Sequence, residues 1–196
     1  MRGAWRRFAG RPLVALVMVL AGAGEARARS EDGSWEFGGA VLYSRFPNES
    51  TIDEDIGYGV RAGYSFRALD ALEFELTRVS TDHSEVDGVS FDVDRMVVSW
   101  IRNFTPKASP KLSPFLRGGL GRIAVEASST GGPSAEDTAT LLRFGGGMRA
   151  FFTERLAFRV DGSLSHWRGE GGAVPKEGQL TFDLAVGLSF ITKGGK

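Results

Sequence analysis

The stretch from Leu180 to Phe190 reads LTFDLAVGLSF, and it decides the fold. Its even positions carry large apolar side chains, and its odd positions carry small or polar ones. Strict alternation over this length predicts a β-strand with one apolar face and one polar face. A soluble sandwich usually carries long charged residues on its polar face. The small polar face from Thr181 to Ser189 instead suits the inside of a narrow barrel whose apolar face meets lipid.

Composition narrows the range of functions. The chain has 196 residues, a length that suits one domain. Its formal net charge is zero, which gives no electrostatic attraction to nucleic acid. It has no cysteine, which excludes disulfides and thiolate chemistry. Its 27 glycines are roughly twice the usual share, which suits crowded barrel walls and tight turns.

The N-terminal segment has the pattern of a cleaved secretory signal. Four arginines precede an uncharged apolar run over residues 13–23, and Ala26-Arg27-Ala28 offers a small-x-small cleavage site. The run is too short for a transmembrane helix, which needs ~20 apolar residues. We therefore predict a signal peptide over residues 1–28, exported by the general secretory route, and one domain over residues 29–196. Removal of five Arg and one Glu leaves 19 basic and 23 acidic residues, a net charge of −4.

Seven further alternating segments precede the closing strand, separated by turn-rich stretches. They are residues 35–44, 56–66, 72–77, 89–104, 115–125, 141–152 and 156–166. Eight strands in total is an even number, as a barrel with both termini in the periplasm requires. Longer polar connections alternate with tight turns at 67–70 and 153–155, although 105–113 is long where a short turn is expected. The sequence predicts an all-β fold, an eight-stranded antiparallel up-and-down transmembrane β-barrel.

Two strands leave their phase open. In residues 89–104, Val89, Phe91 and Val93 share one phase, and the apolar residues from Met96 onward share the other. Either a β-bulge near Arg95 restores one continuous face, or the first part of the strand projects beyond the membrane, where the pattern need not hold. In the fifth strand, residues 115–125, the glycines leave open which positions face inward.

Three pieces of sequence resemble a known family. SPFLRGGLG at 113–121 is similar to the Pro-aromatic-x-x-Gly-x-Gly strand of the OmpA/OmpX-type outer-membrane β-barrel domain, which is widespread in Gram-negative bacteria. TERLAFRVDGSLSHW at 153–167 is similar to the family's penultimate strand, and the closing strand is the third piece. The resemblance covers essentially the whole mature chain. It implies residence in the cell outer membrane, contact with outer-membrane lipid and lipopolysaccharide, and insertion by the barrel-assembly machinery. It does not specify a function, because the family's members do many unrelated things.

The closing strand also resembles the C-terminal signature of bacterial outer-membrane barrels, which ends in Phe. Here six residues, 191–196, follow that Phe. The resemblance implies an assembly signal on the outward face, formed by Phe182, Leu184, Val186, Leu188 and Phe190.

The polar faces of the strands collect charges of both signs. An eight-stranded barrel has an interior only about wide enough for side chains, so we expect these charges to pair and to fill the lumen. The predicted lumen charge network is Glu36, Arg61, Glu73, Glu75, Arg143, Arg149, Arg159, Asp161 and Asp183, with Arg117 as a further candidate. The pairs expected between neighbouring strands are Arg61 with Glu73 or Glu75, and Arg143 or Arg149 with Asp161. The functional alternative is a gated ion path.

Aromatic residues gather near the predicted strand ends. Two interfacial girdles explain them more simply than a binding surface does, with Phe115 on the turn side and Phe91 on the loop side. The polar loops are acidic, but none has the fixed ligand spacing of a calcium loop, so no metal site is predicted.

A catalytic site finds no support. Outer-membrane lipid A deacylases are eight-stranded barrels marked by a His followed two residues later by Ser, and here His166 is followed by Arg168. Ser163 and Ser165 lie near Asp161 in sequence, but the second histidine is far away in a loop, so no nucleophile and base are paired. We interpret His166 as a surface residue and predict no enzyme activity, no cofactor and no nucleic-acid partner.

The sequence therefore predicts an integral outer-membrane barrel with a charge-plugged lumen and a structural or surface-interaction role. The alternatives are a small porin or channel, and an outer-membrane lipid-modifying enzyme. A soluble periplasmic barrel of lipocalin type requires its bulky face inward and a charged exterior, and the small, glycine-rich polar face argues against it. The ligand or host partner is left open.

Overall fold

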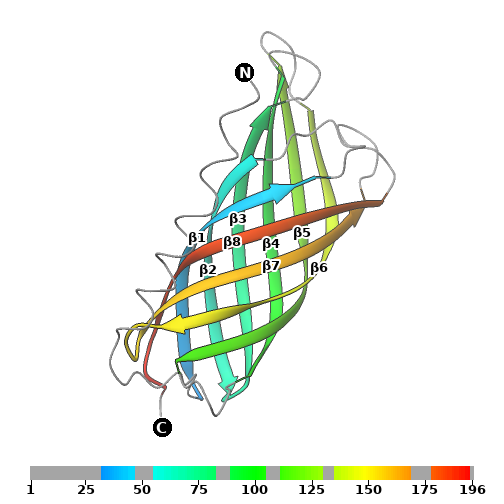
Figure 1. Cartoon of the computed structure of the whole chain (residues 1–196). Coiled ribbons are helices and arrows are strands. Elements are labelled where there is room, and N and C mark those ends of the chain that lie inside the picture. Colours follow the sequence, from blue (N-terminus) through cyan, green and yellow to red (C-terminus); the bar gives the residue numbers. More distant parts are fainter. Residues whose placement is uncertain are drawn as a thin grey trace.

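The computed structural model describes residues 32–46, 55–82, 89–104, 111–129, 135–168 and 178–194. In these residues eight strands form one closed antiparallel barrel (Figure 1). The strands are β1 (Ser34–Arg45), β2 (Asp55–Arg67), β3 (Asp70–Asp82), β4 (Val89–Asn103), β5 (Leu112–Ser129), β6 (Ala135–Phe151), β7 (Leu156–Arg168) and β8 (Gly178–Ile191). Each strand pairs with the next, and β8 pairs with β1 to close the sheet. The predicted fold class is confirmed. The same residues include no helix long and apolar enough to cross a membrane.

β1 begins and β8 ends at the end of the barrel that carries the tight turns. The backbone N–H of Thr192 donates to the carbonyl of Trp35 at 2.8 Å, and that of Ile191 donates to Arg155 in the β6–β7 turn at 2.7 Å. Gly33, just before β1, has a left-handed φ of 79° and donates to Ser65 beside the β2–β3 turn. The described chain therefore enters and leaves at one end, called the turn end below. The predicted signal peptide lies outside the described residues and stays a prediction.

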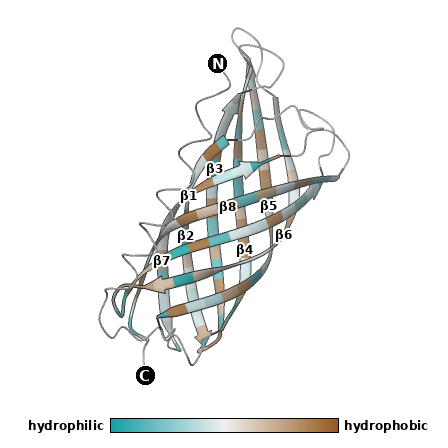
Figure 2. Cartoon of the chain, in the orientation of Figure 1, coloured by the Kyte–Doolittle hydropathy of each residue, from teal (hydrophilic) through white to brown (hydrophobic). Residues whose placement is uncertain are grey.

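The outer wall is apolar through most of its height. Large apolar side chains point outward from every strand, and Figure 2 shows hydrophobic and hydrophilic residues alternating along the strands. Leu120 and Leu188 are among the most exposed, at 62% and 59%. So continuous an apolar surface is rare on a soluble monomer and suits contact with lipid. Near the turn end, Trp35 stacks on Phe37 with ring centroids 6.1 Å apart, as in an interfacial aromatic belt.

The phase of β4 is resolved without a bulge. Its register with β3 and with β5 is unbroken, so the predicted bulge near Arg95 is wrong. The alternative, in which the first part of the strand projects beyond the membrane, stays a prediction. Phe91 and Val93 face the interior, at 5% and 0% exposed, while Asp92 and Asp94 face outward. Beyond the apolar band the outer wall meets water, so apolar side chains are buried only by pointing inward.

The phase of β5 follows the same pattern. Leu116 and Leu120 point outward, and Arg117 and Ile123 point inward. Phe115 also lies inside, 2% exposed. The placement of Phe115 and Phe91 in lipid-facing girdles is therefore wrong.

Glycine on the lumen face allows neighbouring strands to approach closely. A Cβ at Gly187 would overlap the carbonyl oxygen of Gly39, and one at Gly147 would overlap that of Val160. Only a residue without a side chain fits there, which gives a packing reason for the glycine-rich inner faces of β6 and β8.

The charged lumen as the candidate functional site

Every strand contributes at least one buried charged side chain to the barrel interior. These side chains are Glu36 (β1), Arg61 (β2), Glu73 and Glu75 (β3), Arg95 (β4), Arg117 (β5), Arg143 and Arg149 (β6), Arg159 and Asp161 (β7), and Asp183 (β8), and each is at most 13% exposed. The structure places every residue of the sequence-predicted lumen network in this layer, together with Arg117 and Arg95. Alternation sets this arrangement, because each residue occupies the inward phase of its strand.

Arg159 organises the turn-end part of the network and is fully buried. Its Nη1 and Nη2 donate to the two carboxylate oxygens of Glu73 at 2.5 and 3.0 Å, and its Nη1 also reaches Glu36 at 3.3 Å. Glu36 accepts from Arg149 as well, at 2.9–3.1 Å. The ring of Phe115 faces the guanidinium groups of Arg149 and Arg159, 4.5 and 4.4 Å from the ring centroid, a cation–π arrangement. Two cations are thus held by carboxylates and one aromatic ring.

Asp161 joins the centre of the network. It forms ion pairs with Arg61 at 3.0 Å, with Arg117 at 2.9 Å and with Arg159 at 3.0 Å. Its side chain is fully buried. One carboxylate therefore compensates part of the charge of three guanidinium groups from three different strands.

Glu75 and Asp183 form the part of the network nearer the loop end. Glu75 accepts from Arg117 at 2.9 Å and from Arg143. Asp183 accepts from Arg95 at 2.8 Å, from Ser44 at 2.6 Å and from Arg143 at 3.3 Å. Arg143 bridges the two carboxylates across the lumen.

The predicted pairing between neighbouring strands is wrong. Arg61 pairs with Asp161, from β2 to β7, rather than with Glu73 or Glu75 beside it. Arg149 pairs with Glu36, from β6 to β1. In so narrow a barrel, long side chains from facing walls reach one another across the lumen, so most partners belong to strands that are not adjacent in the sheet; the exception is Arg159 with Asp161, both on β7.

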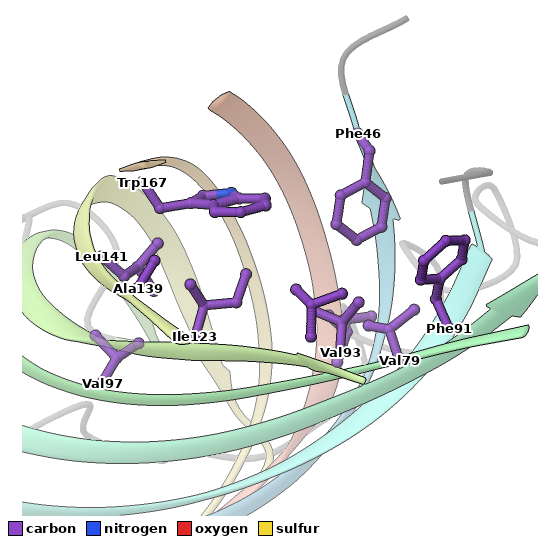
Figure 3. Close-up of a cluster of buried hydrophobic side chains, with 11 residues drawn as sticks. Phe46, Val79, Phe91, Val93, Val97, Ile123, Ala139, Leu141 and Trp167 are labelled. Carbon is purple, nitrogen blue, oxygen red and sulfur yellow. The ribbon is translucent and has the colours of Figure 1, made fainter. Parts of the chain in front are cut away.

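An apolar cluster fills the lumen on the loop side of the charges. It comprises Leu42, Phe46, Val79, Phe91, Val93, Val97, Ile123, Val125, Ala139, Leu141 and Trp167. Figure 3 shows these side chains converging inside the barrel from several strands. Trp167 is 1% exposed, and its indole N–H donates to Thr181 Oγ1 at 3.0 Å. The lumen is thus mostly charged at mid-height and mostly apolar on the loop side, with Arg95 placed 5.4 Å from the ring centroid of Phe46 where the two parts meet.

Sequence reasoning missed this apolar layer and Arg95. The signal that marks both is the change of phase within a strand. On β4 the inward residues are Phe91, Val93 and Arg95, and the outward apolar residues begin at Met96. On β3 the outward Leu76 is likewise followed by the inward Val79. Because the switch recurs at the same level on paired strands, it marks the loop-side edge of the lipid-facing band.

The residues considered for catalysis do not come together. His166 is exposed on the outer face, whereas Ser163 and Ser165 are buried inside the barrel. Ser163 accepts from Arg117 at 3.2 Å and Ser165 accepts from Arg143 at 3.0 Å, so both hydroxyls serve the charge network. His83 lies outside the described residues. Within the described ranges no group of His, Asp and Glu is arranged to hold a metal ion.

Comparison with solved structures shows the fold of small outer-membrane barrels. Neisserial surface protein A is similar with a TM-score of 0.64 at 14% identity, over 81% of this chain and 97% of that one. The N-terminal barrel of Pseudomonas aeruginosa OprF gives 0.53 at 19% identity, over 82% and 100%. Ail of Yersinia pestis gives 0.54 at 16% identity, over 82% and 99%. Among curated protein sequences none matches this chain.

The sequence itself matches a family over nearly its whole length. Residues 13–190 match the outer membrane protein beta-barrel domain. This range covers all eight strands except the last residue of β8. With its apolar outer wall and closed topology, the barrel resides in the cell outer membrane. The chain therefore belongs to the family of outer membrane proteins built on a β-barrel domain.

Proposed function

We propose that this barrel is closed to ions and acts as a structural or surface-interacting protein of the outer membrane. The observation that carries the proposal is the hub at Asp161, where one buried carboxylate joins three arginines from β2, β5 and β7. The pair with Arg61 spans the lumen from β2 to β7, and the pairs Arg159–Glu73 and Arg95–Asp183 join β7 to β3 and β4 to β8. An ion path would have to break several of them at once.

The apolar cluster adds a second obstacle. A narrow apolar constriction excludes water, and an ion that enters it loses its hydration without gaining polar partners. Trp167 and Phe46 supply large rings to this layer. A small porin, the rival function, requires a continuous polar path, and no observation in the described residues favours one.

We also propose that the surface role includes binding of the phosphate groups of lipopolysaccharide. Arg45, His166 and Arg168 are exposed on β1 and β7, which flank β8, near the loop-side edge of the apolar band. Arg45 is paired in register with Phe182, and His166 with Leu180, both apolar and outward. Arginine and imidazole side chains beside outward apolar ones match a lipid that has anionic head groups and acyl chains.

An enzyme of this membrane would need a nucleophile beside a base, and His166 and the buried serines lie on opposite faces of β7. A non-enzymatic role accordingly remains part of the proposal. The assembly signal on the outward residues of β8 stays a prediction. Those residues, Phe182, Leu184, Val186, Leu188 and Phe190, are 40–59% exposed on the outer wall, where an assembly factor can reach them.

Conductance in planar bilayers tests the closed lumen. The purified full-length protein is expected to show no steady, stepwise conductance. The double variant Glu73→Gln, Glu75→Gln, which removes partners of Arg117, Arg143 and Arg159, is expected to show rare, brief openings. Stable, large conductance of the unmodified protein would contradict the proposal and favour the porin.

Lipopolysaccharide binding is tested separately. The double variant Arg45→Gln, Arg168→Gln is expected to lose most of the thermal stabilisation that added lipopolysaccharide gives the unmodified protein in detergent. Arg67→Gln, which removes an exposed arginine at the turn end, is the matched control and is expected to keep it. Equal stabilisation of all three proteins would refute this part of the proposal.

A further inference from the structure

A small cavity lies in the lumen where the charged layer meets the apolar layer. Its volume is about 20 Å3. This is room for about one water molecule or one ion of similar size. The polar residues that line it include Arg61, Thr77, Arg117, Glu75 and Asp183, and Leu42 of the apolar cluster forms part of its wall.

The hydrogen-bonding groups around this cavity are not balanced. Within the described residues, Arg61 Nη2, Arg117 Nε and Thr77 Oγ1 are buried without a protein hydrogen-bond partner. The carboxylates that line the cavity are already occupied, because both oxygens of Glu75 and both oxygens of Asp183 accept from guanidinium groups. The groups left over are two N–H donors and a hydroxyl that can donate. Whatever fills the cavity has to accept hydrogen bonds.

The formal charge of the layer points the same way. The buried network contains six arginines and five carboxylates, which leaves one positive charge. Asp70 does not correct the difference, since it pairs at the turn end with Arg102. Asp55 and Asp137 are half-buried at the level of the apolar cluster, where their register partners are Ser44 and Val125. In the described residues Asp55 forms no ion pair with an arginine of the layer, and its carboxylate accepts from the backbone N–H of Ile56. An uncompensated buried charge is costly, and a water molecule would satisfy the open donors without removing it.

We propose that this cavity binds one small monovalent anion of the halide class, with chloride as the natural candidate. The anion accepts from the guanidinium groups of Arg61 and Arg117 and from the hydroxyl of Thr77, and it brings the charge of the layer to zero. The small volume excludes large organic anions such as gluconate. The site depends on the network and not on whether the lumen conducts, so it is tested independently of the closed-barrel proposal.

Unfolding in different salts gives the first test. The purified full-length protein in detergent micelles is heated in sodium chloride, sodium bromide or sodium gluconate at equal ionic strength. A higher midpoint in chloride and bromide than in gluconate is expected, and the difference should saturate with halide concentration. Arg61→Gln, which makes the count of charges five against five, is expected to abolish the difference. Arg78→Gln is the matched control, because it removes an arginine from the outer wall and is expected to retain it.

A second variant keeps the test sound if Arg61→Gln does not fold. Ala185 lines the cavity, and Ala185→Val fills it without changing any charge. This variant is also expected to lose the dependence on halide. Crystals grown in bromide should show an anomalous peak within the cavity. Three results would each overturn the proposal. The unfolding midpoint could be the same in all three salts, or its dependence on halide could survive both variants. Crystals grown in bromide could also show a water molecule and no anomalous peak in the cavity.

Discussion

Replacement of Asp161 by Asn is expected to destabilise the barrel more than any other single neutralisation in the network. The substitution keeps the size of the side chain and removes one negative charge that faces Arg61, Arg117 and Arg159 within 3.0 Å. Hydrogen bonds to charged groups contribute about 1.5–3 kcal/mol each. The neutral amide still accepts from one arginine, so the loss is smaller than the sum of three. Removal of one partner of a buried ion pair costs ~3–5 kcal/mol, and we expect a value in this range.

This loss is a large fraction of the stability of a typical domain, about 5–15 kcal/mol. The assay is equilibrium unfolding by urea in detergent micelles, followed by tryptophan fluorescence, to which Trp35 and Trp100 on the outer wall contribute together with Trp167 in the lumen. Asp94→Asn is the matched control. It breaks the ion pair with Arg78 on the outer wall, where both side chains are 46% exposed and water screens the interaction, and it should change stability little.

A double-mutant cycle sharpens the result. Arg61→Gln in the Asp161→Asn background removes one of the cations left without its partner, so the double variant should be more stable than the sum of the single losses predicts. A coupling of about 0.5–3 kcal/mol is expected. The reasoning would be refuted if Asp161→Asn were as stable as Asp94→Asn, or if the two losses were simply additive.

Three other variants test other parts of the structure. Leu184→Arg places a charge on the lipid face of β8, so it should cost ~2–4 kcal/mol and reduce the folded yield, which is read from heat-modifiable migration on a gel. The neighbouring inward change Ala185→Ser should be tolerated. The opposite ranking of the two variants would show that the faces are reversed. Trp167→Ala removes the largest ring of the apolar cluster and should cost ~3–5 kcal/mol in urea unfolding, with Leu180→Ala on the outer wall of β8 as a milder comparison. Gly187→Ala should lower the thermal midpoint, because its Cβ would overlap the backbone of β1, whereas Gly162→Ala, which meets no atom closer than 3.8 Å, should not.

The lipid-facing wall was predictable from the sequence because a single rule governs it. Between the two membrane surfaces, lipid requires apolar side chains outside and the narrow lumen requires small or polar ones inside, so alternation in β8 and β6 has one interpretation. The same rule fails beyond the membrane. There water wets the outer wall and only the inside is dry, so Phe91 and Val93 point inward although Val98 and Trp100 on the same strand point outward.

Alternation along the strands also predicted which residues belong to the charge network, but it did not predict which of them pair. Alternation assigns Arg61 and Asp161 to the inner face without saying which side chains meet. They are 100 residues apart on strands that do not touch in the sheet, and their contact depends on the tilt and stagger of the closed barrel. Arg95 was not predicted because it lies where the apolar residues of β4 change from one phase to the other, so the sequence did not decide which face of the strand points inward.

The cross-lumen pairs also have a consequence for the rate at which the barrel opens and closes. Asp183 on the last strand is held by Arg95 on β4, by Arg143 on β6 and by Ser44 on β1, so its set of partners is complete only when the first and last strands meet. A half-wrapped sheet leaves these charges unpaired, and the pairs form after most of the strand ladder. Interactions made so late are absent from the folding transition state, and they act by slowing unfolding rather than by speeding folding. Once inserted, such a barrel is expected to persist through a high kinetic barrier, with unfolding half-lives that shorten sharply when the β1–β8 seam loses Asp183.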